Sequence, residues 1–169
     1  MDQITLGGGC FWCLEAVFQR VRGVEAVQSG YAGGQLPDPS YKDVCRGDSG
    51  HAEVVQVHFD PRALALDDLF ELFFNAHDPT TLNRQGNDVG PQYRSIILFQ
   101  SPAQQQAAQA AMARAQADYD LPLVTELAPL ETFYPAEVEH RDYYNRHQTQ
   151  PYCQWVIHPK LAQLQLDAL

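Results

Sequence analysis

The stretch Gly7-Gly8-Gly9-Cys10-Phe11-Trp12-Cys13-Leu14-Glu15 decides how this chain begins to fold. The apolar run 4–6 before it predicts a strand, and the periodic run 14–21 after it predicts a helix. Cys10 therefore lies where a strand passes into a helix, beside the free backbone N–H groups of the first helical turn. Because these groups and the helix dipole favour negative charge, we expect the Cys10 thiol to ionise more easily than a free cysteine, whose pKa is about 8.5. The pattern is typical of a nucleophile.

Cys10 has a second interpretation, because an isolated cysteine is usually a small buried hydrophobic residue. Three glycines before it and Cys13 one helical turn after it argue against that interpretation, since burying apolar surface does not require three glycines. The next two residues, Phe11 and Trp12, can be core residues or the wall of a substrate site. The stretch alone leaves both roles open.

Size and charge exclude several classes of function. The 169 residues are 45% hydrophobic, which suits one full core, and we expect a single catalytic domain over residues 1–169. Lys and Arg number 11 against 21 Asp and Glu, giving a formal charge of -10, and no basic run is interleaved with aromatic residues. Neither nucleic acid nor an anionic membrane is therefore an expected partner. With no signal-peptide pattern and no stretch of membrane-span length, we expect a soluble, cytoplasmic protein.

The cysteine content indicates thiol chemistry or a metal site. A domain of this size needs no disulfide scaffold, so the four cysteines are not expected to be structural staples. A metal bound by Cys10 and Cys13 would need two further ligands, and the sequence has no second C-x-x-C and no His-x₃-His pair. We therefore expect neither a metal nor a bound cofactor. The four are Cys10, Cys13, Cys45 and Cys153.

The rest of the chain alternates between strands and helices, with two long loops rich in turn residues at 35–50 and 76–93. This mixed order predicts an α+β fold: a two-layer α/β sandwich of the ferredoxin-like plait type, with a mixed sheet, long active-site loops and a C-terminal extension. The expected strands are 24–31, 54–59, 94–99 and 123–127, and the expected helices are 64–74, 102–118, 137–146 and 160–169.

Glu53 lies at the mouth of the predicted central strand 54–59, close to His51. A carboxylate at a strand entrance is most often a solvated end residue, so its position alone leaves a catalytic role for Glu53 open. For His51 we expect a mainly structural role.

Seven short motifs follow one another along the chain: Gly8-Gly9-Cys10-Phe11-Trp12, Tyr31-Ala32-Gly33-Gly34, Pro39-Ser40-Tyr41, Gly50-His51-Ala52-Glu53, His77-Asp78-Pro79, Arg84-Gln85-Gly86-Asn87-Asp88 and Gln92-Tyr93-Arg94-Ser95. In this order they resemble the class A peptide-methionine sulfoxide reductases, over almost the whole chain. Seven motifs in series make the resemblance very specific. Enzymes of this class reduce one epimer of methionine sulfoxide. The resemblance therefore implies reduction of the S-sulfoxide, free or in proteins, as antioxidant protein repair.

The resemblance implies roles for the residues around the reacting sulfur. Cys10 would attack the sulfoxide sulfur, while Phe11 and Trp12 would hold the methyl group and exclude water. Asp88 matches a position that supports the site through hydrogen bonds.

The resemblance also implies that Glu53, Tyr41 and Tyr93 bind the sulfoxide oxygen. A sulfoxide is a poor electrophile until its oxygen is protonated or strongly hydrogen-bonded. An acid with a raised pKa and two phenol donors would supply what the chemistry lacks. Pro91 departs from the family pattern, in which a small polar residue is common, and could shift Tyr93 slightly.

The expected reaction leaves Cys10 as a sulfenic acid, which a second thiol converts to a disulfide that an external dithiol reduces. The resemblance implies thioredoxin as this external reductant, and we expect a monomer. Whether substrates are free or protein-bound stays open.

The second thiol is open between Cys13 and Cys153, with Cys45 a distant third. Many members of the family have glycine in place of Cys13 and use a cysteine in a mobile C-terminal tail, a position that Cys153 matches. The apolar residues after Cys153 predict packing instead of mobility. A disulfide between Cys10 and Cys13 lies within the first helical turn and requires some distortion there.

A general thiol–disulfide oxidoreductase is the alternative function, with Cys10-Phe11-Trp12-Cys13 as its C-x-x-C motif. Bulky aromatic residues between the cysteines would crowd an approaching disulfide, and the glycine turn and Glu53 would have no role. Reduction of insulin without any sulfoxide would distinguish this alternative.

Overall fold

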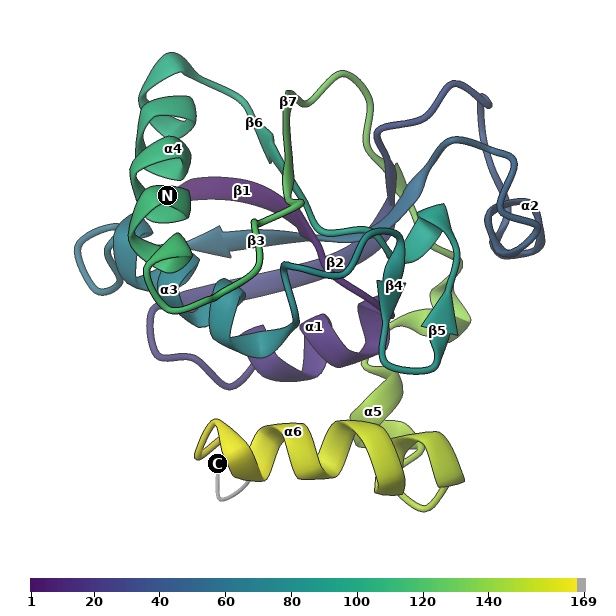
Figure 1. Ribbon diagram of the computed structural model, residues 1–169. Helices are drawn as coiled ribbons and strands as arrows, with labels where there is room; N and C mark the ends of the chain where they lie inside the picture. The colour runs from purple at the N-terminus through teal and green to yellow at the C-terminus, as the bar shows by residue number, and fades with distance from the viewer. Residues whose placement is uncertain (167–169) are drawn as a thin grey trace.

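A mixed six-stranded sheet forms the centre of the computed structural model, which describes residues 1–166 (Figure 1). The strand order is β7-β6-β1-β3-β2-β8, and every neighbouring pair is antiparallel except β6 and β7, which are parallel. A separate two-stranded hairpin pairs β4 with β5. The strands are β1 (Asp2–Gly7), β2 (Val24–Ala32), β3 (Ala52–Phe59), β4 (Arg84–Gln85), β5 (Asp88–Val89), β6 (Ile96–Phe99), β7 (Glu126–Pro129) and β8 (Tyr134–Pro135).

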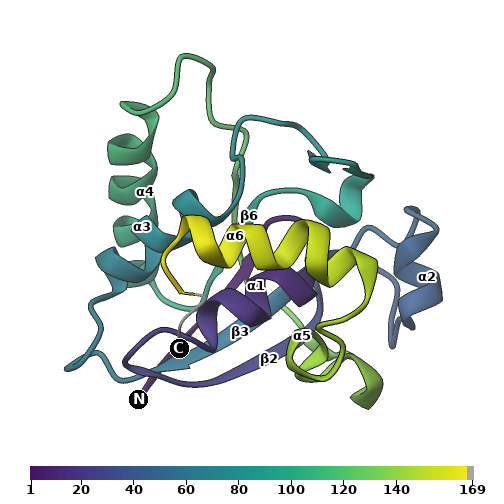
Figure 2. The same cartoon turned by 90° about the horizontal axis from the view of Figure 1, so that it is seen from below.

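Helices α1 and α3 cover one face of this sheet, and α4 packs beside α3 and β6 (Figure 1). The C-terminal segment, residues 137–166, crosses the outer side of α1, as Figure 2 shows for α6. This arrangement confirms the predicted α+β class with its mixed sheet and C-terminal extension. The helices are α1 (Phe11–Phe18), α2 (Tyr41–Cys45), α3 (Leu66–Ala76), α4 (Pro102–Gln116), α5 (Tyr143–Arg146) and α6 (His158–Gln163); shorter 3₁₀ turns span Pro91–Tyr93 and Val138–His140, and a π-helix spans Cys153–Ile157.

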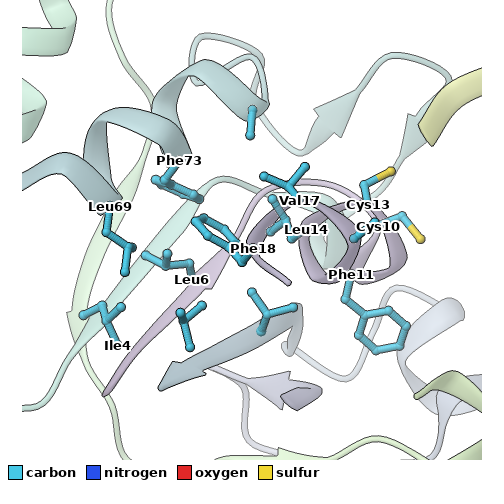
Figure 3. Packing of buried hydrophobic residues seen from close by; sticks show 14 of the residues in the cluster. Ile4, Leu6, Cys10, Phe11, Cys13, Leu14, Val17, Phe18, Leu69 and Phe73 are labelled. Carbon is cyan, nitrogen blue, oxygen red and sulfur yellow. The ribbon is translucent and has the colours of Figure 1, made fainter. Parts of the chain in front are cut away.

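The main core lies between the sheet and the helices. Side chains alternate along a strand, so Glu53, Val55 and Val57 of β3 share the face under α1 and α3. Figure 3 shows Leu14, Val17 and Phe18 of α1 meeting Leu69 and Phe73 of α3 above Ile4 and Leu6 of β1. The neighbouring residues Ala52 and Val54 point to the other face of the sheet and belong to a smaller apolar cluster there. The core face of β3 therefore carries one carboxyl group, on Glu53.

The glycine turn before α1 is shaped by backbone geometry that side chains would obstruct. Gly9 has φ +90°, which favours glycine, and a Cβ on Gly7 would lie 2.9 Å from the carbonyl oxygen of Glu53. After this turn α1 begins at Phe11 and ends at Phe18, three residues earlier at each end than the predicted helix 14–21. The two aromatic residues and Cys13 therefore form its first turn.

Two other predictions for helices needed correction. The expected helix 137–146 is broken: a 3₁₀ turn covers Val138–His140, Asp142 adopts the left-handed conformation with φ 53°, and only Tyr143–Arg146 is α-helical. The expected helix 160–169 begins earlier, at His158, and its last three residues lie outside the described part of the chain. The predicted packing after Cys153 is also only half right, since Trp155 is 77% exposed although Ile157 is buried.

A buried carboxylate on α1 explains the break at Asp142. The side chain of Glu15 is 2% exposed and accepts hydrogen bonds from the backbone N–H groups of Asp142 (3.0 Å) and Tyr143 (3.3 Å). These groups would otherwise be free donors at the start of α5. Glu15 therefore fixes the C-terminal segment on α1.

Among the described residues, none of the helices combines the length and apolar character that crossing a bilayer requires.

We predict that Glu15→Ala lowers the free energy of unfolding by about 2 kcal/mol, because it leaves two backbone donors without their acceptor. Urea denaturation followed by circular dichroism measures this change. Glu71→Ala on the exposed side of α3 is the control and should change stability by less than about 0.5 kcal/mol. Equal effects of the two variants would contradict the role given to Glu15.

Candidate active site

The carboxyl group of Glu53 caps the first turn of α1. Its Oε1 atom accepts a hydrogen bond of 3.0 Å from the backbone N–H of Phe11, while no side chain near the helix start caps it. Glu53 is fully buried, and its Oε2 atom accepts no hydrogen bond from any residue that the structure describes. Burial raises the pKa of Glu53 to about 8, more than the Phe11 N–H lowers it. At neutral pH this carboxyl group is mostly protonated and can donate a proton.

Cys10 is the N-cap residue of α1 and is 5% exposed. The predicted easy ionisation of its thiol was wrong: burial raises the pKa of Cys10 well above its ordinary value, and the charges of Glu53 and Cys13 raise it further. The backbone N–H of Trp12 lowers it, as expected for a helix N-terminus, but by less. Protonating Glu53 removes one of the opposing charges, so the thiolate of Cys10 is favoured when Glu53 is neutral.

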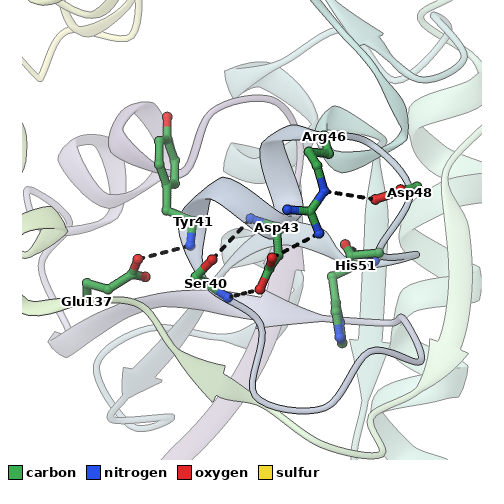
Figure 4. Close-up of polar contacts among 8 residues, drawn as sticks. Ser40, Tyr41, Asp43, Arg46, Asp48, His51 and Glu137 are labelled. Carbon is green, nitrogen blue, oxygen red and sulfur yellow. Dashed lines mark hydrogen bonds and ion pairs between the residues drawn. The ribbon is translucent and has the colours of Figure 1, made fainter.

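Tyr41 is placed by the short helix α2 (Figure 4). A capping box begins this helix: Ser40 Oγ accepts from the N–H of Asp43 (3.1 Å), and Asp43 Oδ2 accepts from the N–H of Ser40 (2.9 Å). The N–H of Tyr41 donates to Glu137 Oε2 at 2.9 Å, which joins α2 to the C-terminal segment. The ring of Tyr41 packs 6.1 Å from that of Phe11, measured between centroids.

Tyr93 ends the 3₁₀ turn that Pro91 begins, and its carbonyl oxygen accepts a 3.1 Å hydrogen bond from the N–H of Gly9. The loop 77–95 is thereby tied to the glycine turn. Burial raises the pKa values of Tyr93 and Tyr41, and the charge of Glu53 is the second cause for both. Both phenols thus lie near enough to Glu53 and Cys10 for the charges of these two groups to raise the pKa of each phenol, and both phenols keep their protons at neutral pH.

Trp12 is covered by two residues that the sequence analysis missed. Its indole ring stacks on the ring of Tyr143 with centroids 3.8 Å apart and planes within 6°, and its Nε1–H donates to His140 Nδ1 at 3.1 Å. Phe11 is fully buried with its ring 5.4 Å from that of His140. The aromatic and polar run 133–146 was a visible signal, but the expected unbroken helix did not indicate which of its residues would face Trp12.

His51 has the structural role that was expected. Its Nδ1 atom accepts from the N–H of Gly34 (3.1 Å), and its Nε2 atom lies 2.7 Å from the carbonyl oxygen of Leu36. His51 therefore holds the start of the loop 35–50 against the sheet.

A cleft of about 560 Å³ lies beside the first turn of α1. Cys10 and Cys13 open onto it, and Asp88, Tyr152 and Lys160 border it. Glu53, the two phenols and the two aromatic residues after Cys10 do not line this cleft. Of Cys10, Glu53, Tyr41 and Tyr93, only Cys10 therefore lines the cleft.

Cys13 and Asp88, two further predicted residues, are linked along the cleft by Tyr152, which the sequence analysis missed. The N–H of Cys13 donates to the carbonyl of Cys10 at 3.1 Å, and Cys13 Sγ lies 3.6 Å from the hydroxyl of Tyr152. That hydroxyl donates to Asp88 Oδ2 at 2.7 Å. Cys153 is buried next to Cys13, whose charge raises the pKa of Cys153 after burial does. All four cysteines are free thiols, and Cys45 is exposed on α2.

Within residues 1–166 the one grouping that could offer a metal three ligand atoms is Glu137, Glu139 and His140. It contains no cysteine. Glu137 already accepts from Tyr31 Oη (2.9 Å) and from a backbone N–H, and His140 Nδ1 accepts from an indole. These hydrogen bonds explain why the three side chains lie close together without a bound ion.

Comparisons with known proteins give a consistent result. Residues 2–168 match the family model described as peptide methionine sulfoxide reductase. A relative from Sulfolobus acidocaldarius, named peptide methionine sulfoxide reductase MsrA, is 53% identical over 161 residues, covering 95% of this chain and 92% of that protein.

Two solved structures of Mxr1 from Saccharomyces cerevisiae share the architecture. The reduced form has a TM-score of 0.85 at 35% identity, covering 90% of this chain and 88% of that one. The form in complex with Trx2 has a TM-score of 0.61 at 26% identity, covering 84% of each chain.

We predict that Glu53→Gln flattens the pH dependence of stability. Because the folded pKa of Glu53, about 8, lies above the unfolded value of about 4.3, its contribution is fully present below pH 4.3 and is lost as the pH rises through 8. Glu53→Gln should therefore gain on the order of 3 kcal/mol over the wild type between pH 5 and pH 9. Urea unfolding at pH 5, 7 and 9 measures this. Glu25→Gln, at an exposed position, should show no such gain; a wild-type slope in Glu53→Gln would contradict the raised pKa.

Proposed function

The chain belongs to the peptide methionine sulfoxide reductase family, and from this premise we propose that it reduces methionine-S-sulfoxide to methionine. The observation that carries the proposal is the fully buried carboxyl group of Glu53, with a pKa of about 8, at the first helical turn that holds Cys10. A thiol nucleophile beside a neutral acid is the pair that sulfoxide reduction requires.

In the proposed first step the Cys10 thiolate attacks the sulfoxide sulfur while Glu53 gives its proton to the oxygen. An S–S bond forms between Cys10 and the substrate, and this bond and the S–O bond of the substrate then break as the protonated oxygen passes to the sulfur of Cys10. Methionine leaves, Cys10 is left as a sulfenic acid, and the proton that the Cys10 thiol lost on becoming a thiolate returns Glu53 to its acid form. Tyr41 and Tyr93 hydrogen-bond the same oxygen and stabilise the charge that develops on it. Their raised pKa values support this role, because both phenols keep their protons at neutral pH.

We assign the methyl group of the substrate to the aromatic side chains of Phe11 and Trp12. Their rings lie 6.1 and 6.2 Å from the ring of Tyr41, so a methyl group held there would bring the sulfoxide oxygen toward the phenols. Tyr143 and His140 cover Trp12 and would help to exclude water. A dry site also keeps Glu53 protonated.

We propose Cys13 as the thiol that condenses with the sulfenic acid, forming the Cys10–Cys13 disulfide and releasing water. One observation supports Cys13 over Cys153: Cys10 and Cys13 line the same cleft, whereas Cys153 does not line it. Cys153 is fully buried next to Cys13 and would take over the disulfide from it by exchange. Cys45 has no part in this relay.

We propose thioredoxin as the external reductant, with no bound cofactor. The structure of Mxr1 in complex with Trx2 supports this partner. We also propose that residues 1–169 act as one catalytic domain, because Cys10 near the start of the chain and Tyr152 near its end border the same cleft.

We predict that wild-type protein turns over only the S epimer of an acetylated methionine sulfoxide amide, with thioredoxin, its reductase and NADPH. Cys10→Ser should abolish turnover. Cys13→Ser should keep one turnover but lose recycling at least about tenfold, because its sulfenic acid has no adjacent thiol. NADPH consumption measures recycling, and chromatography of the methionine product measures the single turnover.

The other cysteine variants separate the outcomes of this assay. Cys45→Ser is the control and should recycle like the wild type. Full recycling in Cys13→Ser with none in Cys153→Ser would assign the condensing thiol to Cys153. No turnover of either epimer, together with reduction of insulin, would replace the proposed function by general thiol–disulfide exchange.

We predict that Glu53→Gln lowers the rate of the first turnover by about 10² to 10⁴, because an amide cannot give the proton. Tyr41→Phe and Tyr93→Phe should each lower it by about tenfold, since the other phenol remains. In the wild type the rate should rise with pH as Cys10 ionises and level off above pH 8, where Glu53 loses its proton, whereas in Glu53→Gln the rise should continue. Rapid-quench measurement of methionine at pH 6 to 9 tests both statements. An unchanged rate in Glu53→Gln would remove Glu53 from the mechanism.

A further inference from the structure

The hydroxyl group of Tyr152 lies between the cleft and the two thiols of the proposed relay. Tyr152 directly precedes the π-helix Cys153–Ile157, an irregular helix type that is frequent at functional sites. Its oxygen is 2.7 Å from Asp88 Oδ2, to which it donates, and 3.6 Å from Cys13 Sγ. Both neighbours are groups that can carry negative charge.

A phenol has one hydrogen, so it can donate to only one of these neighbours at a time. While that hydrogen points to Asp88, the oxygen can only accept from the thiol S–H of Cys13. When Cys13 loses its proton, the thiolate becomes an acceptor at the same distance, and rotation about one C–O bond brings the hydrogen to it. The contact pair thus has two arrangements, which differ in the direction of the phenol hydrogen and in whether Cys13 holds its thiol proton.

The other charged groups around Cys13 do not by themselves favour its thiolate. Lys160 of α6 lowers the pKa of Cys13, but burial raises it more, and Asp88 of β5 and Glu53 of β3 raise it further. The thiols of Cys10 and Cys153 are the remaining titratable neighbours. His77, which also lines the cleft, has its pKa lowered to about 4 by burial and stays neutral.

We propose that Tyr152 is a proton switch for the second step of the reaction: its hydroxyl turns from Asp88 to the sulfur of Cys13 as that thiol becomes the nucleophile. This inference rests on the proposed function, because it needs the sulfenic acid on Cys10. The hydroxyl of Tyr152 contacts the sulfur of Cys13, while its ring packs edge-on against Trp12 with centroids 5.9 Å apart. Tyr152→Phe keeps this ring and removes only the hydroxyl, so we assign the hydroxyl a role in formation of the disulfide alone.

The step balances in atoms and electrons. Cys13 releases its proton to water in the cleft, and its thiolate, held by the Tyr152 hydroxyl, attacks the sulfur of the Cys10 sulfenic acid. The S–O bond breaks as the S–S bond forms, and the leaving hydroxide takes up a proton to become water. Cys13 is oxidised and Cys10 is reduced, with no further reactant.

We predict that Tyr152→Phe leaves the methionine burst of the pre-reduced protein unchanged but slows disulfide formation about tenfold at pH 7. The pH midpoint of disulfide formation should rise by about one unit, because the thiolate loses its donor. Single turnovers with acetylated methionine-S-sulfoxide amide and no reductant are run between pH 6 and 11, a range that extends above the ordinary pKa of a thiol because burial raises that of Cys13, and are quenched in acid. Chromatography then counts methionine, and intact mass after thiol labelling counts disulfides.

Tyr144→Phe is the matched control. Its hydroxyl lies 3.2 Å from His158 Nδ1 and joins α5 to α6, so the variant loosens the same C-terminal segment without touching Cys13. It should match the wild type in both steps and in pH midpoint. The inference is overturned if Tyr152→Phe forms its disulfide at the wild-type rate and with the wild-type pH midpoint. It is also overturned if Tyr144→Phe changes this rate and this midpoint as much as Tyr152→Phe does, or if Tyr152→Phe loses the methionine burst. Absence of a burst in the wild type would instead refute the proposed function.

Discussion

The hydrogen bond from the Phe11 N–H to the Glu53 carboxyl is the contact on which the rest of the site depends. It closes the open end of α1 with a group from β3, and it holds Glu53 in the dry space under that helix. Tyr31 is paired with Glu53 in the sheet and is also fully buried, so the carboxyl group is enclosed on the strand side as well. The side chain of Glu53 thus caps α1, fills a position in the core and, in the proposed mechanism, donates the proton.

This arrangement has an energetic consequence. Burying Glu53 with one unpartnered oxygen disfavours its charge, which costs stability at high pH and keeps a proton available at neutral pH. The same burial raises the pKa of Cys10 and so favours the thiol over the thiolate. A sulfoxide that takes the proton of Glu53 would leave a carboxylate beside the sulfur that has already reacted, and the two negative charges need not coexist. Burial thus disfavours the charged form of both Glu53 and Cys10, so in the proposed mechanism Glu53 becomes a carboxylate only once the Cys10 sulfur has reacted.

Two carboxyl groups, of the buried Glu15 and the half-buried Glu137, also determine where the C-terminal segment lies. Glu15 holds the backbone at Asp142, and Glu137 joins Tyr31 to the N–H of Tyr41. Neither contact is visible in the sequence, because the partners are 96 to 127 residues apart. These contacts explain why the expected helix 137–146 is interrupted. The interruption in turn brings Tyr143 onto Trp12, which no periodicity could have indicated.

The sequence by itself determined the elements whose signals are local and the order of the site motifs. The apolar run of β3 predicted a central strand, and Pro102 marked the first residue of α4, because side-chain alternation and cap preferences act over a few residues. Only the tertiary structure decided the start of α1, the raised pKa of Cys10 and the position of Tyr152 between Asp88 and Cys13. Each of these depends on burial or on a partner far along the chain, and a window of sequence contains neither.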